Sequence, residues 1–172
     1  MKRGNLNILV VDDSEEDRIL LRRAIRKCAI PGVSLQMIAS GNLAVKYLRG
    51  YGQYQDRNQF PYPTFVLTDL KMSDGDGFTV LDYLNNTPRS AVIPTVMLSA
   101  SADPDDVKMA YSLGASAYLV KPTSVSALTV LVQNLMAFWM ACEVPEVDQS
   151  GVQLRTQSAG KIGQRFEEDV LY

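Results

Sequence analysis

Histidine is absent from the 172 residues of this chain, and its absence excludes several kinds of chemistry. Without an imidazole, the chain cannot form a Ser-His-Asp or Cys-His nucleophile pair or a histidine-ligated zinc site. It cannot carry a phosphohistidine either. Any phosphoryl chemistry must therefore use another covalent partner and a donor that is another molecule.

The chain also has few cysteines and a small net charge. The two cysteines, Cys28 and Cys142, show neither metal-ligand spacing nor a disulfide framework, and we expect both to be buried helix residues. The formal net charge is -2, which gives no reason to expect binding to nucleic acid. No signal-peptide pattern precedes the first apolar run, so the sequence predicts a cytoplasmic protein.

Apolar residues make up 47% of the chain and charged residues 21%, as in ordinary soluble domains. We expect one folded domain over residues 5–142 with a substantial core. Residues 143–172 hold few apolar residues and no periodicity, which predicts a flexible polar tail.

Residues 122–142 carry no charge and are almost long enough to cross a bilayer. Thr129, Gln133 and Asn134 interrupt this segment, which favours a helix of a soluble domain over residues 124–142. One apolar stripe should cover the sheet; it consists of Val125, Leu128, Val132, Leu135, Met136 and Trp139. Other apolar residues lie largely off it, namely Val130, Leu131, Phe138 and Met140. We therefore expect a homodimer through this helix, unless the tail or the segment 51–63 covers it.

Short apolar runs alternate with helical patterns, which predicts a parallel sheet built from βαβ units. The expected strands lie at about residues 6–11, 34–38, 64–68, 94–98 and 117–120. Residues 51–63 have no periodicity and carry Tyr51, Tyr54, Phe60 and Tyr62. A connection of this length is either a surface flap whose aromatic side chains fold back or a loop that contacts a partner.

Polar side chains follow four of the five predicted strands. Asp12 and Asp13 follow the first, Asp69 the third, Ser99 the fourth and Lys121 the fifth. In an open α/β sheet, ligands bind beyond the carboxyl ends of the strands, so these groups can meet in one crevice. They suit a divalent cation and a phosphoryl group on a carboxylate. We predict a flavodoxin-like, doubly wound α/β fold with strand order 2-1-3-4-5 and helices on both faces.

Each of these groups alone means little, because an Asp pair can cap a helix and Lys-Pro can mark a turn. Together, in this order, they resemble the receiver domain of two-component response regulators. The resemblance implies that Asp69 is the phosphoacceptor and that Ser99 and Lys121 contact phosphoryl oxygens. It also implies a Ser99–Tyr118 switch and a cis peptide bond between Lys121 and Pro122.

Mg²⁺ is the cofactor that this resemblance implies. Asp13 and Asp69 can supply ligands directly, and Asp12 directly or through water. The resemblance adds the backbone carbonyl of Lys71, with its side chain pointing toward the entrance. Ser73 departs from the family, which usually has proline there.

The long loop and the apolar final helix are similar to those of single-domain regulators that serve bacterial phytochrome-type histidine kinases. A sensor histidine kinase of that type is therefore the implied partner. No output domain is evident, so we expect signalling through changed protein contacts, without binding to nucleic acid or membrane, and no catalysis beyond the protein's own phosphorylation and dephosphorylation.

Two other classes stay open. A magnesium-dependent phosphohydrolase of the haloacid dehalogenase type would place Asp-x-Asp after its first strand, but the chain has Asp12-Asp13-Ser14-Glu15. A pseudo-receiver would keep the fold as a binding module without phosphorylation, against which the intact acids, Ser99 and Lys121 speak.

Overall fold

A computed structural model describes residues 6–87 and 93–143 of the chain. The predicted tail, 143–172, lies outside this part except for its first residue. Five parallel strands form one sheet in the order β2-β1-β3-β4-β5, as predicted. The strands are β1 (Asn7–Val11), β2 (Ser34–Ile38), β3 (Phe65–Thr68), β4 (Thr95–Ser99) and β5 (Ala117–Val120).

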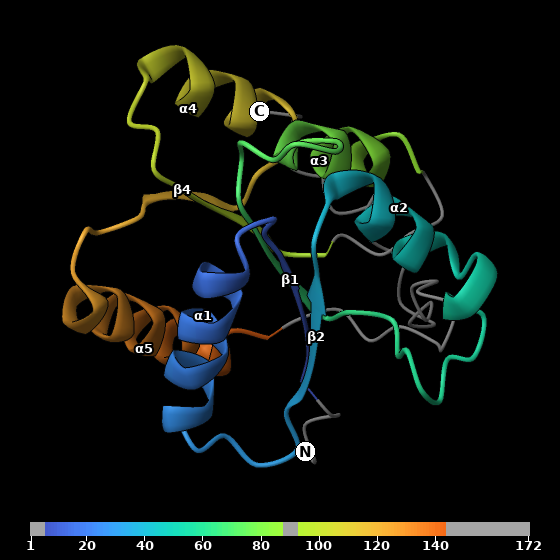
Figure 1. Ribbon diagram of the computed structural model, residues 1–172, viewed down its shortest axis with the longest axis horizontal. Coiled ribbons are helices and arrows are strands. Elements are labelled where there is room, and N and C mark those ends of the chain that lie inside the picture. Colours follow the sequence, from blue (N-terminus) through green and yellow to red (C-terminus); the bar gives the residue numbers. More distant parts are fainter. Residues whose placement is uncertain (1–5, 88–92, 144–172) are drawn as a thin grey trace, which may run out of the picture.

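Helices cover both faces of this sheet (Figure 1). They are α1 (Glu15–Lys27), α2 (Gly41–Arg49), the short 3-10 helix η1 (Gly52–Tyr54), α3 (Gly77–Asn85), α4 (Pro104–Ser112) and α5 (Val125–Ala141). Helices α1 and α5 pack together on one face, and α2 and α3 on the other. Each α-helix begins after a serine or aspartate whose side chain accepts a hydrogen bond from a first-turn amide. These caps are Ser14, Ser40, Asp76, Asp103 and Ser124.

The core has a layer on each face of the sheet, because successive strand residues point to opposite faces. Ile8 and Val10 of β1 pack toward α1 and α5, whereas Leu9 and Val11 pack toward α2 and α3. All four are at most 1% exposed. The strand that carries Asp12 at its end is therefore fixed from both sides.

Helix α5 buries a slightly different stripe from the predicted one. Leu128, Val132 and Met136 are buried, but Val125 is 56% exposed because it lies in the first turn, beyond the core layer. Leu131 packs against the core instead of lying off it. The predicted burial of Cys28 and Cys142 is wrong: both thiols are half-buried, because each cysteine caps the end of its helix. No helix in the described part of the chain could cross a membrane.

The segment between α2 and β3 folds back on the domain, as the surface-flap interpretation of its aromatic residues predicts. Tyr54 and Tyr62 are buried in the core layer beside α2, and Phe60 packs against the same layer. Tyr51 alone of the four points outward, with 67% of its surface exposed.

Arg57 fastens this segment to the end of α2. Its guanidinium donates to the carbonyl oxygens of Tyr47 (2.9 Å) and Leu48 (2.8 Å). It also lies over the Tyr47 and Tyr62 rings. The last carbonyls of a helix lack partners within the helix, so Arg57 completes the carboxyl end of α2 from the loop that follows it.

Candidate functional site

Three carboxylates meet at the carboxyl ends of β1 and β3. One oxygen each of Asp12, Asp13 and Asp69 lies within 4.8 Å of the others. The pairing of β1 with β3 places Val11 beside Thr68, so the residues that follow each strand come together. The structure thus brings the three predicted acids into one cluster.

Lys121, which follows β5, reaches across into this cluster. Its Nζ donates to Asp12 Oδ2 at 2.7 Å, Asp17 Oδ2 at 2.8 Å and Asp69 Oδ2 at 3.0 Å. Burial lowers the pKa of Lys121, but its carboxylate partners, Asp12 first, outweigh burial and raise that pKa above its ordinary value. The site therefore favours the charged ammonium form of Lys121 beside the Asp69 carboxylate.

Asp12 is the most deeply placed of the acids, with 1% of its surface exposed. Burial raises the pKa of Asp12, the charge of Asp69 adds to this, and the hydrogen bond from Lys121 opposes it. The amide of Ser14 donates to Asp12 Oδ1 at 2.9 Å, which joins the start of α1 to the cluster. Several carboxylates so close together repel one another, and a cation among them offsets the repulsion.

The donor set fits a hard divalent cation. Mg²⁺ and similar ions take oxygen ligands, usually one or two carboxylates with water and phosphate. Asp13 Oδ2 is oriented by the amide of Ser73 at 2.9 Å. The Lys71 carbonyl oxygen accepts no hydrogen bond within the described residues, which leaves it free to act as a ligand. The Lys71 side chain is exposed and lies 3.4 Å from Asp106 Oδ2 of α4.

Ser99 ends β4 and Tyr118 lies in β5, and neither side chain is hydrogen-bonded to the cluster in the described part of the chain. Ser99 is buried, and its Oγ accepts from the amide of Ser101 at 3.2 Å. The Tyr118 hydroxyl donates to the Ser101 carbonyl at 3.0 Å. Ser101 Oγ in turn donates to Asp106 Oδ2 at 2.6 Å. Ser101 therefore links both predicted switch residues to α4.

The predicted cis bond before Pro122 is wrong: no cis peptide bond occurs among the described residues. A trans bond suffices because the lysine side chain is long enough to reach Asp12 and Asp69 without that bend. The trans form is also the lower in energy, by about 0.5–1 kcal/mol for a bond before proline.

Gly77 lets the first turn of α3 approach the end of β3. A Cβ atom at this position would collide with the Asp69 carbonyl oxygen and with the Met97 side chain. The amide of Gly77 donates to the Leu70 carbonyl at 2.9 Å, which closes the loop behind the cluster. Any larger residue would push α3 away from the Asp69 backbone.

Sequence reasoning missed Asp17, Ser101 and Asp106 as members of the site. Asp17 lies in the first turn of α1, where negative charge is common for helices in general. Its signal was its place three residues after the cap, on the turn that follows Asp12 and Asp13. Ser101 and Asp106 gave no signal, because their contact depends on how the chain turns between β4 and α4.

Comparison with known proteins is consistent with this geometry. A family model described as the response regulator receiver domain matches residues 8–133. The chain belongs to this family. The receiver domain is 32% identical to the response regulator Rcp1 of Synechocystis over 133 residues, 77% of this chain and 88% of Rcp1. These matches do not favour the phosphohydrolase or pseudo-receiver alternatives.

Solved structures show the same fold. The receiver domain is similar to RPA3017, a response regulator in red light signalling of R. palustris, with 29% identity, a TM-score of 0.76 and coverage of 83% of this chain and 99% of that one. The Mn²⁺-bound form of Rcp1 gives 30% identity and a TM-score of 0.75, with 82% and 99% covered. The phosphorylated cyanobacterial phytochrome response regulator RcpA has 28% identity and a TM-score of 0.74, and the match covers 83% of this chain and 100% of that one.

Proposed function

We propose that this receiver domain accepts a phosphoryl group on Asp69 from a sensor histidine kinase. The observation that carries the proposal is the Lys121 ammonium, 3.0 Å from Asp69 Oδ2 inside the three-carboxylate cluster. Asp69 offers a nucleophilic oxygen, and Lys121 offers positive charge at the position where phosphoryl charge will arrive. Phosphoryl transfer depends mainly on such positioning and charge stabilisation.

In the transfer, a carboxylate oxygen of Asp69 forms a bond to phosphorus while the bond between phosphorus and the donor's imidazole nitrogen breaks. One Lys121 N–H then donates to a phosphoryl oxygen. Ser99 Oγ donates to another after it leaves its contact with the Ser101 amide. Mg²⁺, when held by Asp12, Asp13, Asp69 and the Lys71 carbonyl, supplies positive charge that offsets the repulsion between the carboxylates and the phosphoryl group.

The kinase is of the phytochrome type in this proposal. The support comes from relatives whose names tie them to red light signalling and to a cyanobacterial phytochrome. It also comes from the length of the match, because the chain covers 99% and 100% of those two structures. We place the protein in the cytoplasm, where such a kinase presents its phosphohistidine.

The output is a change in protein contacts, without nucleic acid. Phosphorylation draws Ser99 toward the phosphoryl group and turns Tyr118 inward, which shifts an existing equilibrium. Both residues act on Ser101, which is bonded to Asp106 of α4. The surface beside α4 therefore changes with the state of Asp69.

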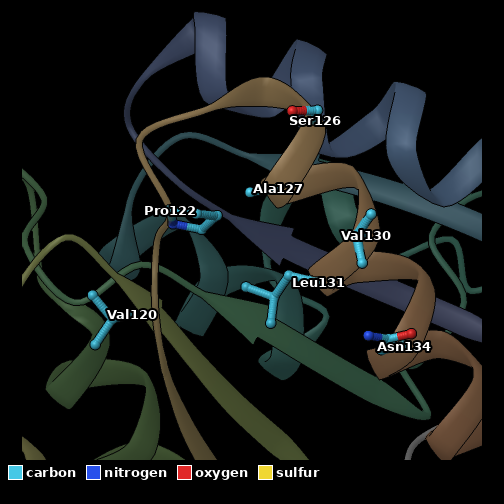
Figure 2. Close-up of a pocket in the computed structure, with 7 residues that line it drawn as sticks. All are labelled: Val120, Pro122, Ser126, Ala127, Val130, Leu131 and Asn134. Carbon is cyan, nitrogen blue, oxygen red and sulfur yellow. The ribbon is translucent and has the colours of Figure 1, made fainter.

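The surface of α5 is the proposed homodimer contact. A shallow apolar hollow lies between the end of β5 and α5 (Figure 2). It is lined by Val120, Pro122, Ser126, Ala127, Val130, Leu131 and Asn134. Phe138, further along α5, is 60% exposed. Large apolar side chains gathered on one face are typical of a protein contact.

The test is phosphorylation by acetyl phosphate with and without Mg²⁺, followed by peptide mass spectrometry. The wild-type chain should gain one phosphoryl group on Asp69, only with Mg²⁺. Asp69→Asn should gain none, whereas Asp82→Asn, which alters an aspartate on α3, should behave as wild type. Full incorporation in Asp69→Asn would refute the acceptor assignment.

A further inference from the structure

Two overlapping sets of carboxylates share the site. Asp12, Asp13 and Asp69 form the cluster that fits a cation. Asp12, Asp17 and Asp69 instead accept the three hydrogen bonds from Lys121 Nζ. Asp17 contacts the lysine without belonging to the cation cluster, so its role differs from that of the other acids.

All three N–H groups of the Lys121 ammonium are engaged, each by a different element of the fold. Asp12 follows β1, Asp17 lies in α1 and Asp69 follows β3. When Asp69 carries a phosphoryl group, its carboxylate becomes an acyl phosphate whose carbonyl oxygen no longer carries the carboxylate charge, so Asp69 holds Lys121 less strongly. Asp12 and Asp17 are then the carboxylates that still hold the ammonium, and the third N–H is released for the phosphoryl oxygen.

The backbone around Asp17 is well fixed. The Ser14 hydroxyl accepts from the Asp17 amide at 3.2 Å, and the Arg18 guanidinium donates to the Asp12 carbonyl. The first turn of α1 is thereby tied to the end of β1. The Asp17 side chain is 35% exposed and that of Lys121 13%, so the pair lies at the rim of the site.

We propose that Asp17 is a positioning residue that holds the Lys121 ammonium in place for the phosphoryl group while Asp69 changes from carboxylate to acyl phosphate. This rests on the proposed function. This role predicts that loss of Asp17 leaves the long, flexible Lys121 side chain with one fewer carboxylate to hold its ammonium. The ammonium then spends less time where the phosphoryl group arrives, and phosphorylation becomes slower.

The first measurement needs neither phosphodonor nor metal. The full chain is treated briefly with dilute acetic anhydride, and acetylation of Lys121 is compared with that of exposed Lys108 by mass spectrometry. Asp17→Ala should raise the Lys121 ratio by at least about twofold, the size expected for a partly exposed ion pair. Glu16→Ala is the matched control, because it removes the same charge from the same turn and Glu16 makes no contact with Lys121 in the described structure. Asp17→Glu should restore most of the protection.

The second measurement is the rate of Asp69 phosphorylation by acetyl phosphate. Asp17→Ala should be slower than Glu16→Ala by at least about twofold, and comparison of these two variants cancels the change in net charge. Equal Lys121 labelling in both variants, or equal phosphorylation rates, would overturn the positioning role. A wild-type chain that takes no phosphoryl group would instead refute the proposed function, and the labelling result would still decide whether Asp17 holds Lys121.

Discussion

Lys121 Nζ lies 3.0 Å from Asp69 Oδ2, although 52 positions separate the two residues in the sequence. Lys121 follows the edge strand β5 and Asp69 the central strand β3, with β4 between them. The Lys121 side chain spans the width of β4, and its Nζ also donates to Asp12 Oδ2, beyond β3, at 2.7 Å. Fold and site are therefore linked, because the contact requires the strand order 2-1-3-4-5.

Cation binding should depend on Asp13 more than on the lysine-holding Asp17. Asp13→Asn removes a charged oxygen from the cluster but keeps a side chain that can accept the Ser73 amide bond. We expect weaker Mg²⁺ binding, measured by calorimetric titration, with an unchanged fold. Glu15→Gln, on the first turn of α1, is the control for net charge. Equal Mg²⁺ affinity in both variants would show that Asp13 is not a ligand.

Arg57 should stabilise the segment 51–63. Arg57→Ala removes its hydrogen bonds to the end of α2, and a hydrogen bond from a charged group contributes about 1.5–3 kcal/mol. We expect a lower free energy of unfolding in urea and faster proteolysis within 51–63. Arg57→Lys should recover only part of the loss, since an ammonium lacks the planar fork. An unchanged proteolysis pattern in Arg57→Ala would contradict this role.

Tyr47 should make stability fall at high pH. Burial raises the pKa of Tyr47 from 10.0 to about 12, because the charged phenolate is disfavoured inside the core. At a pH below the pKa of this tyrosine in the unfolded chain, the phenol is neutral and its contribution to folding stability is complete. This contribution is lost as the pH rises through the pKa of Tyr47 in the folded chain. Wild type should therefore lose stability relative to Tyr47→Phe between pH 10 and about 12. A constant difference between the two proteins over this range would argue against the shift.

Phe138 should contribute to self-association. Sedimentation at tens of micromolar, with and without phosphorylation, should show a dimer for the full chain and for a version ending at Cys142. Phe138→Asp places a charge on the exposed face of α5 and should give a monomer. A monomer in all three cases would leave the dimer without support.

Much of the fold and the central acids could be predicted from sequence, because local patterns encode them. The apolar runs predicted the five strands, and each observed strand lies within or close to its predicted range. Asp12 and Asp13 come after β1 and Asp69 comes after β3, two strands that pair in the sheet, so topology brings the three acids together. These predictions needed no knowledge of how distant loops pack.

The remainder depends on contacts that no local pattern encodes. Arg57 completes a helix from a neighbouring loop, and Asp17 reaches Lys121 only because α1 starts beside the cluster. The inward face of α5 was misjudged at Val125, since periodicity gives the direction of a side chain but not where the core layer ends. The bond before Pro122 was inferred from resemblance, and the reach of the lysine makes the bend unnecessary.

The lifetime of the phosphorylated chain tests the central claim most directly. The protein is phosphorylated with acetyl phosphate and Mg²⁺, freed of donor, and followed by intact mass with Asp69→Asn alongside. We predict one phosphoryl group per wild-type chain that decays slowly enough to be observed, and none on Asp69→Asn. Rapid turnover of small phosphate esters would indicate a phosphohydrolase, absence of any modification would indicate a pseudo-receiver, and either result would contradict the phosphoacceptor role of Asp69.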